Sequence, residues 1–182
     1  MADFRRRLAV AALIRTDGQP HPVLCTDHLF VGSVGCVLNA ASLRDAGITH
    51  TLCVGAGVSP PPESTVVELG LTHGHFGVTD TPDSDICSIF EPCFEFIEEC
   101  KRVSGRVLVY CFQGKSRSVT VAMAYLMKYH NLSCVSALAA IRQTRPIAKP
   151  NLGFIVALRK YERELALLLE VGKDTEEYDT GQ

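Results

Sequence analysis

The stretch from Val107 to Ser118, VLVYCFQGKSRS, decides how the rest of the chain is interpreted. It begins with an apolar run, continues through a cysteine and a glycine-bearing loop, and ends where an arginine and a serine open a predicted helix. A run that is apolar on both faces is typical of a central parallel strand covered by helices. Ligands bind at the carboxyl ends of such strands, so the loop after Cys111 is the first candidate for a functional site.

The residues of this loop suit a nucleophile that attacks a bound anion. Gly114 permits a turn that points successive backbone N–H groups inward, and these groups, with the positive end of the following helix, favour a phosphate. The same field favours the thiolate of Cys111, which is its nucleophilic form. Five residues separate Cys111 from Arg117, so a curled loop can direct both side chains at one centre. Ser118 is expected beside the sulfur. The alternative, a buried structural cysteine beside a surface arginine, is disfavoured because four suitable residue types coincide at one junction.

The segment resembles the signature loop of the cysteine-dependent protein tyrosine phosphatases. The Ser-Arg-Ser sequence followed by TVAMAYLM is similar to their dual-specificity branch, in its small, atypical, single-domain form. LFVGSVGCVLNAASLRDAGITHTLCV (29–54) resembles that family's opening strand, helix and strand, and RPIAKPNLGFIVALRKYE (145–162) resembles its closing segment. One position departs from the family pattern, because the family usually has histidine where this chain has Tyr110.

The resemblance implies an α/β fold in which a central mixed, mainly parallel sheet is flanked by helices, with the signature loop between a central strand and a helix. It also implies hydrolysis of phosphotyrosine and of phosphoserine or phosphothreonine on proteins, through a phosphocysteine intermediate. Cys111 would attack phosphorus, Arg117 would hold the phosphate, and Ser118 would help the thiolate depart. No metal or organic cofactor is expected. The residues expected to bind substrate are Phe112, Gln113, Gly114, Lys115, Ser116 and Arg117.

A second chemical segment is VTDTPDSDI, residues 78–86, a polar loop with three carboxylates. By resemblance to the family's general-acid loop, the proton donor is Asp80, because a Val-x-Asp sequence followed by Pro82 and Asp85 recurs there. Asp85 is expected to favour the positive end of the following helix, and Asp83 is expected to be solvated. By resemblance Asn151 braces the active-site loop, although capping of the last helix would also explain it.

Strand and helix signals alternate along the remaining chain. A strand at 29–31, a helix over 40–46 and a strand over 49–54 predict a parallel βαβ unit. Residues 65–78 are predicted to supply further strands, and Ser88, with Glu91 three residues later, is predicted to cap the next helix. Later helices are predicted over 118–130, from Ser133 onward, and over 152–170.

Composition indicates one compact domain. The chain has 182 residues, 47% of them hydrophobic and 21% charged, which is enough for a single core. We expect the domain to span 21–170, preceded by a helical extension over 1–20 and followed by a mobile acidic tail over 171–182. A net charge of −2 without a basic stripe argues against a nucleic-acid groove, and no apolar run is long enough to span a bilayer.

The predicted partners are therefore phosphoproteins, with neither nucleic acid nor membrane expected, and the oligomeric state is left open. Eight scattered cysteines without a CxxC pair indicate reduced thiols and a cytoplasmic protein, with the nucleus as a second compartment.

Two other functions stay open at this point. Lys115 in the loop suggests a phosphoinositide phosphatase on the same scaffold, although neutral Phe112 and Gln113 give a multiply charged headgroup little support. Tyr110 suggests a phosphatase-like module that binds phosphopeptides without turnover. The same tyrosine predicts low intrinsic activity for an enzyme, because a histidine there could carry a positive charge that supports the thiolate.

Overall fold

The computed structural model describes residues 21–179, with side chains through Glu170. The predicted N-terminal extension over 1–20 lies outside the described residues. The elements, in chain order, are β1 (Val23–Leu24), β2 (Leu29–Ser33), α2 (Val34–Val37), α3 (Ala40–Asp45), β3 (His50–Cys53), α4 (Glu63–Leu69), β4 (Thr72–His75), the 3₁₀ helix η1 (Cys87–Ile89), α5 (Phe90–Arg102), β5 (Val107–Cys111), α6 (Arg117–His130), α7 (Cys134–Thr144) and α8 (Leu152–Asp179).

The sheet has the strand order β1-β2-β5-β3-β4. β1 is antiparallel to β2, and all other pairs are parallel. β5, the last strand in the sequence, lies at the centre of the sheet, and every residue of β2 and β5 is buried. These observations confirm the predicted mixed, mainly parallel sheet. Ser33 is the register partner of Cys111, so the carboxyl ends of neighbouring parallel strands meet beside the cysteine.

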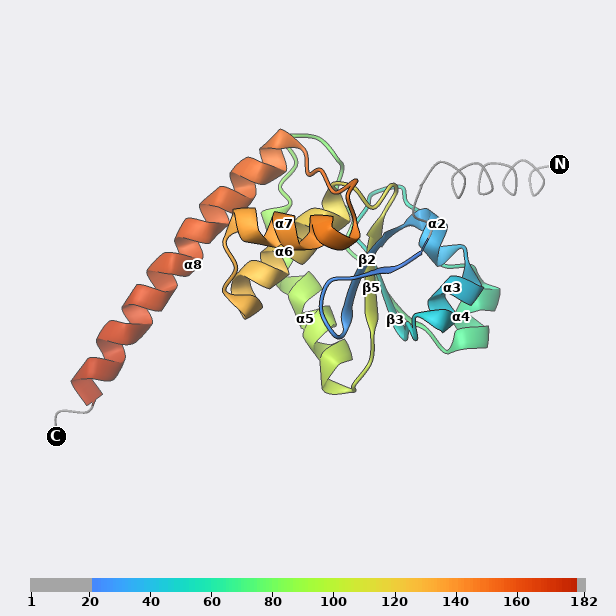
Figure 1. Cartoon of the computed structure of the whole chain (residues 1–182), viewed down its shortest axis with the longest axis horizontal. Helices are drawn as coiled ribbons and strands as arrows, with labels where there is room; N and C mark the ends of the chain where they lie inside the picture. Colours follow the sequence, from blue (N-terminus) through green and yellow to red (C-terminus); the bar gives the residue numbers. More distant parts are fainter. Residues whose placement is uncertain (1–20, 180–182) are drawn as a thin grey trace.

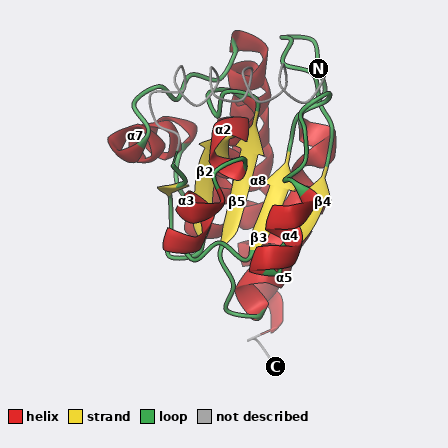
Figure 2. Cartoon of the chain, turned by 90° about the vertical axis from the view of Figure 1, so that its right-hand side faces the viewer, coloured by secondary structure: helices red, strands yellow, loops and turns green. Residues whose placement is uncertain are grey.

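Helices cover both faces of the sheet (Figures 1 and 2). α2, α3 and α4 lie on one face, and α5 to α8 lie on the other. Side chains alternate along a strand, so Tyr110 packs into the core beneath α2–α4, whereas Cys111 belongs to the core beneath α5–α8. This alternation separates the two adjacent residues onto opposite faces.

The prediction of a strand over 65–71 is wrong, because Glu63–Leu69 forms α4. Pro62 precedes the helix, and Gly70 ends it with a φ of 62°, its N–H donating to the Val66 carbonyl. These end signals override the β-branched Thr-Val-Val run, since parallel pairing of β3 with β4 requires a crossover segment between them. The prediction of strand structure after residue 71 is confirmed by β4.

The start of α5 also differs from the prediction. Ser88 lies within η1, and α5 begins at Phe90 with no side-chain cap. Asp85 supplies the capping interaction instead, because its Oδ1 accepts from the Ser88 N–H at 3.3 Å. Asp85 therefore lies at the start of the helical segment, as the sequence predicts.

Later helices follow the sequence signals more closely. Ser133 caps α7, its side chain accepting from the Ser136 N–H at 3.1 Å. α8 begins at Leu152 as predicted but continues past Glu170 to Asp179. Among the described residues, no helix is both long and apolar enough to cross a membrane.

Candidate active site

Cys111 ends β5 and is followed by a loop, residues 111–117, which we call the signature loop. The cysteine is 1% exposed, and its Sγ lies 3.3 Å from the Oγ of Ser118 in the first turn of α6. The Ser118 Oγ also donates to the Gly32 carbonyl at 3.4 Å. The sulfur therefore sits at the positive end of a fourteen-residue helix, with a hydroxyl beside it as the sequence predicts.

A buried arginine holds the signature loop from behind. Arg145 is 0% exposed. Its Nε donates to the Gly114 carbonyl at 2.5 Å and its Nη2 donates to the Gln113 carbonyl at 2.9 Å. Gly114 has a φ of 63°, and a Cβ there would overlap the Gly32 carbonyl and the Arg145 guanidinium, so only glycine fits. Sequence reasoning missed Arg145, because an arginine at the end of a helix carries no local sign of burial.

Arg117 lies in the mouth of the loop with part of its guanidinium unsatisfied. It is 9% exposed, and its Nη1 donates to the Val78 carbonyl at 3.2 Å. Its buried Nε has no hydrogen-bond partner within the described part of the chain. A buried donor without a partner costs free energy. Arg117 also lines the cavity beside Cys111, where a guanidinium is suited to the oxygens of a bound anion.

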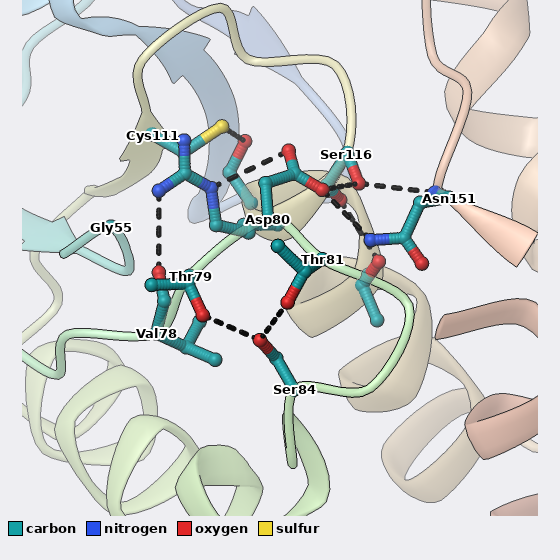
Figure 3. Close-up of polar contacts among 12 residues, drawn as sticks. Gly55, Val78, Thr79, Asp80, Thr81, Ser84, Cys111, Ser116 and Asn151 are labelled. Atoms are coloured by element: carbon teal, nitrogen blue, oxygen red, sulfur yellow. Dashed lines mark hydrogen bonds and ion pairs between the residues drawn. The ribbon is translucent and has the colours of Figure 1, made fainter. Parts of the chain in front are cut away.

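Asp80 is tied to the signature loop and to the start of α8 (Figure 3). Its Oδ1 accepts from the Ser116 Oγ at 2.7 Å and from the Asn151 Nδ2 at 2.8 Å. Its Oδ2 lies 3.5 Å from the Arg117 Nε. The carboxyl predicted to be the general acid is therefore held over the loop that carries the nucleophile.

Asn151 performs both functions that the sequence left open. Its Oδ1 accepts from the Phe154 N–H at 2.9 Å, which caps α8. Its side-chain amide donates to Asp80 at 2.8 Å, and its backbone N–H donates to the Ser116 Oγ at 3.1 Å. One residue thus joins the start of the last helix to both functional loops.

Residues 78–85, which we call the acid loop, are held by side-chain hydroxyl groups. The Ser84 Oγ lies 2.5 Å from the Thr79 Oγ1 and 2.8 Å from the Thr81 Oγ1. A backbone bond from the Ser84 N–H to the Thr81 carbonyl, 3.1 Å long, closes a turn around Pro82. The loop packs closely on α8, because a Cβ at Gly153 would overlap the Pro82 carbonyl.

The two loops enclose a cavity of about 80 Å³. This volume is far below the ~300–1,000 Å³ of a pocket for a drug-sized ligand, so it suits a small anion such as phosphate. Phe112 is 44% exposed. The residues that line the cavity are Asp80, Cys111, Phe112, Gln113, Lys115, Ser116 and Arg117. The structure thus brings most of the predicted site residues to one cavity, while Gly114 and Ser118 support it from beneath.

Tyr110 faces away from this cavity. It is fully buried, and its hydroxyl donates to the Ser59 carbonyl at 3.1 Å. Burial, with a hydrogen bond to the neighbouring Cys53 thiol, raises the pKa of Tyr110 above its ordinary value, so the side chain stays neutral at physiological pH. Its hydroxyl anchors the loop after β3 to the central strand.

Known proteins are similar to this chain in sequence and in structure. A family model of the dual specificity phosphatase catalytic domain matches residues 29–164, a range that includes both loops. Dual specificity protein phosphatase 1 of Arabidopsis thaliana is 38% identical over 161 residues, which cover 88% of this chain and 77% of the relative. The crystal structure of human dual specificity phosphatase 28 is 33% identical with a TM-score of 0.74, covering 81% of this chain and 97% of that one. The human tyrosine phosphatase-like serine/threonine/tyrosine-interacting protein is 26% identical with a TM-score of 0.73, covering 83% and 99% of the two chains.

Proposed function

Because the chain belongs to the dual specificity phosphatase family and is a cysteine-dependent protein phosphatase, we propose that it hydrolyses phosphoproteins at a low intrinsic rate. Cys111 is the nucleophile and Asp80 is the general acid. One observation carries the proposal: Cys111, Arg117 and Asp80 all line one small cavity between the two loops.

In the first step, the Cys111 thiolate attacks phosphorus while the bond from phosphorus to the leaving oxygen breaks. Asp80 gives its proton to that oxygen, so that an alcohol or a phenol leaves. Arg117 and the N–H groups of the signature loop hold the equatorial oxygens, where negative charge gathers in the transition state. The Ser116 and Asn151 hydrogen bonds to Asp80 support the position of the acid.

In the second step, water attacks the phosphocysteine and phosphate departs. Asp80, now a carboxylate, accepts a proton from the attacking water. The Ser118 hydroxyl, 3.3 Å from the sulfur, donates to the thiolate as the sulfur–phosphorus bond breaks. The cycle therefore returns Cys111 and Asp80 to their starting protonation states.

The low rate follows from Tyr110. Its neutral hydroxyl is committed to the Ser59 carbonyl, on the face of the sheet opposite to Cys111. A histidine at this position could carry positive charge one residue from the nucleophile and favour the thiolate. We propose that the chain relies on the loop N–H groups, Arg117 and the helix dipole for this purpose.

We further propose that the substrates are cytoplasmic and nuclear phosphoproteins. The nucleophile is a thiol that must stay reduced to react, and the cytosol maintains that state. No disulfide joins the cysteines of the described part of the chain.

A phosphoinositide phosphatase is the second candidate, favoured by one contact. The Lys149 N–H donates to the Lys115 carbonyl at 2.8 Å, so a second exposed lysine adjoins the lysine that borders the cavity. Two lysine side chains can pair with more phosphate groups of a multiply phosphorylated headgroup than one lysine can. The neutral rim residues Phe112 and Gln113 favour the protein substrate.

The test is hydrolysis of 4-nitrophenyl phosphate by the purified chain, with and without vanadate. We expect vanadate-sensitive turnover that is lost in Cys111→Ser, while the unfolding temperature of the variant stays within a few degrees of the parent. Turnover that survives the substitution would refute the nucleophile. No turnover by the parent, with Cys111→Ser retaining a phosphopeptide, would indicate a binding module.

A panel of phosphotyrosyl peptides, phosphothreonyl peptides and phosphoinositide vesicles then separates the two enzymatic functions. We expect turnover of both kinds of peptide and slower turnover of the lipids. Faster hydrolysis of the lipids would favour the second candidate.

A further inference from the structure

The acid loop contains a threonine followed by proline directly after the general acid. The chain has two such serine or threonine pairs, Ser59–Pro60 and Thr81–Pro82. We propose that Thr81 is a phosphorylation site for a proline-directed serine/threonine kinase, and that a phosphate there lowers activity by displacing Asp80. The inference rests on the proposed role of Asp80 as the general acid.

Thr81 is presented for modification. Thr81, Pro82 and Asp83 are all exposed, and they form the outer side of a loop whose inner side carries Asp80. A proline-directed kinase recognises the residue after the acceptor by its ring and by its missing N–H. The neighbouring hydroxyl groups of Thr79 and Ser84 are followed by aspartate, so they lack this feature.

The Thr81 hydroxyl also maintains the shape of the turn. It lies 2.8 Å from the Ser84 Oγ, and it donates to the Asp83 carboxylate, which holds the pKa of that carboxyl below its ordinary value. The Ser84 Oγ in turn reaches Thr79, on the other side of Asp80. The hydroxyl cluster therefore fixes the backbone on both sides of the general acid.

Phosphorylation of Thr81 would replace the attraction between its hydroxyl group and Asp83 by repulsion. The kinase transfers the terminal phosphoryl group of ATP to the Thr81 Oγ1, ADP leaves, and the hydroxyl proton passes to the base of the kinase. The new group carries about −1.5 to −2 charge at neutral pH and has lost the proton that was donated to Asp83. Like-charge repulsion from Asp83 and Asp85 opposes the closed turn.

The effect reaches Asp80 because the loop has little room to adapt. The Pro82 carbonyl lies against Gly153, so the turn cannot move toward α8 and has to move outward. Asp80, the residue before Thr81, then loses its hydrogen bonds from Ser116 and Asn151, each shorter than 3 Å. Cys111 belongs to the signature loop and stays in place, whereas Arg117 loses its ion pair with Asp80 and keeps its bond to the Val78 carbonyl at the start of the acid loop.

Displacement of the acid has a specific kinetic signature. An enzyme without its general acid depends more strongly on the acidity of the leaving group, because the leaving oxygen departs unprotonated. We expect phosphorylation to reduce kcat/KM for phenyl phosphate at least about tenfold more than for 4-nitrophenyl phosphate. Added negative charge alone would weaken binding of both dianions equally and leave their ratio unchanged.

The site is mapped first on Ser59→Ala, Cys111→Ser protein, which cannot remove the new phosphate and lacks the other proline-directed acceptor. A proline-directed kinase and ATP should label this protein at Thr81, as found by mass spectrometry. The matched control, with Thr81→Val added, should remain unlabelled. Absence of phosphate at Thr81 in the folded protein overturns the proposal.

Activity is then measured on phosphorylated Ser59→Ala protein with Cys111 intact. The quantity to follow is kcat/KM for 4-nitrophenyl phosphate divided by kcat/KM for phenyl phosphate. A rise in this ratio on phosphorylation, similar to the rise caused by Asp80→Asn, supports the proposal. An unchanged ratio in fully phosphorylated protein overturns it. If the unphosphorylated protein hydrolyses neither aryl phosphate, the proposed function has failed instead. The mapping requires no turnover, so it decides the modification site independently.

Discussion

The signature loop and the acid loop meet at one cavity, but they are held in different ways. Cys111, Ser116 and Arg117 of the signature loop are buried, and the carbonyl groups of the loop accept from a fully buried arginine and from the backbone of residue 149. The acid loop is exposed from 79 to 83, and exposed hydroxyl groups maintain its turn. The bonds of the first loop are shielded from water, whereas those of the second compete with it.

The phosphate-binding groups are therefore held in fixed positions, whereas the proton donor lies on a loop that can move. The phosphate-binding groups have to be in place before the substrate arrives, so they gain from a rigid and buried support. A proton donor can be moved without dismantling that support. Segments with few buried contacts open at low cost, and such segments are the ones that modification can control.

Replacing Arg117 by lysine should cause the largest loss. A point charge cannot reproduce the two-pronged contact of a guanidinium with two phosphate oxygens, so we expect kcat/KM for 4-nitrophenyl phosphate to fall about 10³-fold, or ~4 kcal/mol. Arg102→Lys, an exposed arginine paired with Glu99, is the matched control and should keep full activity. Retention of more than about a tenth of the parent rate would contradict the assigned role.

Replacing Asp80 by asparagine should cost less, and the cost should depend on the substrate. Asparagine keeps an oxygen for the Ser116 and Asn151 donors but has no proton to give. We expect a loss of about 10²-fold for phenyl phosphate and a smaller loss for 4-nitrophenyl phosphate.

The control is Asp83→Asn, a fully exposed carboxyl in the same loop, which should leave both rates within about threefold. Equal losses for the two aryl phosphates in Asp80→Asn would show that Asp80 binds substrate rather than donating a proton.

Replacing Arg145 by lysine tests the support of the signature loop. Lysine keeps the charge but cannot reach the Gly114 and Gln113 carbonyls in the same two-pronged geometry. Urea unfolding should show a loss of about 1.5–3 kcal/mol, and kcat should fall about tenfold through misplacement of the loop. Arg142→Lys, an exposed arginine that also donates to a carbonyl, should change both quantities little. Full stability and activity in Arg145→Lys would mean that the loop holds its own shape.

Replacing Tyr110 by histidine should have the smallest effect, and it should be a gain. A protonated histidine on the far face of the strand would place a positive charge one residue from the nucleophile and so favour the thiolate. Alkylation of Cys111 by iodoacetamide should therefore begin about one to two pH units lower, with faster turnover near pH 6. Tyr110→Phe, which removes the hydroxyl bonded to Ser59 and Cys53 but adds no charge, should leave the alkylation profile unchanged. Superimposable profiles for the histidine variant and the parent would make Tyr110 a packing residue and nothing more.

The sequence by itself determined the parts of the site that are contiguous. A strand, a loop and a helix within twelve consecutive residues leave a local pattern, and therefore Cys111, Arg117 and Ser118 could be identified with their relative positions. The same holds for Ser133 at the start of α7, because a cap acts within one helical turn. Asp80 depended on resemblance, since three carboxylates in one loop have no local feature that separates them.

Only the tertiary structure decided how the contiguous pieces support one another. Asn151 reaches Asp80 across 71 residues of sequence, and Ser116 reaches it across 36. Arg145 shows no sign in the sequence that it is buried behind Gly114. α4 formed where β-branched residues favoured a strand, because the pairing of β3 with β4 requires a crossover. Contacts between distant segments leave no periodicity in the chain, so packing alone determined which residues brace the loop and which aspartate faces the cysteine.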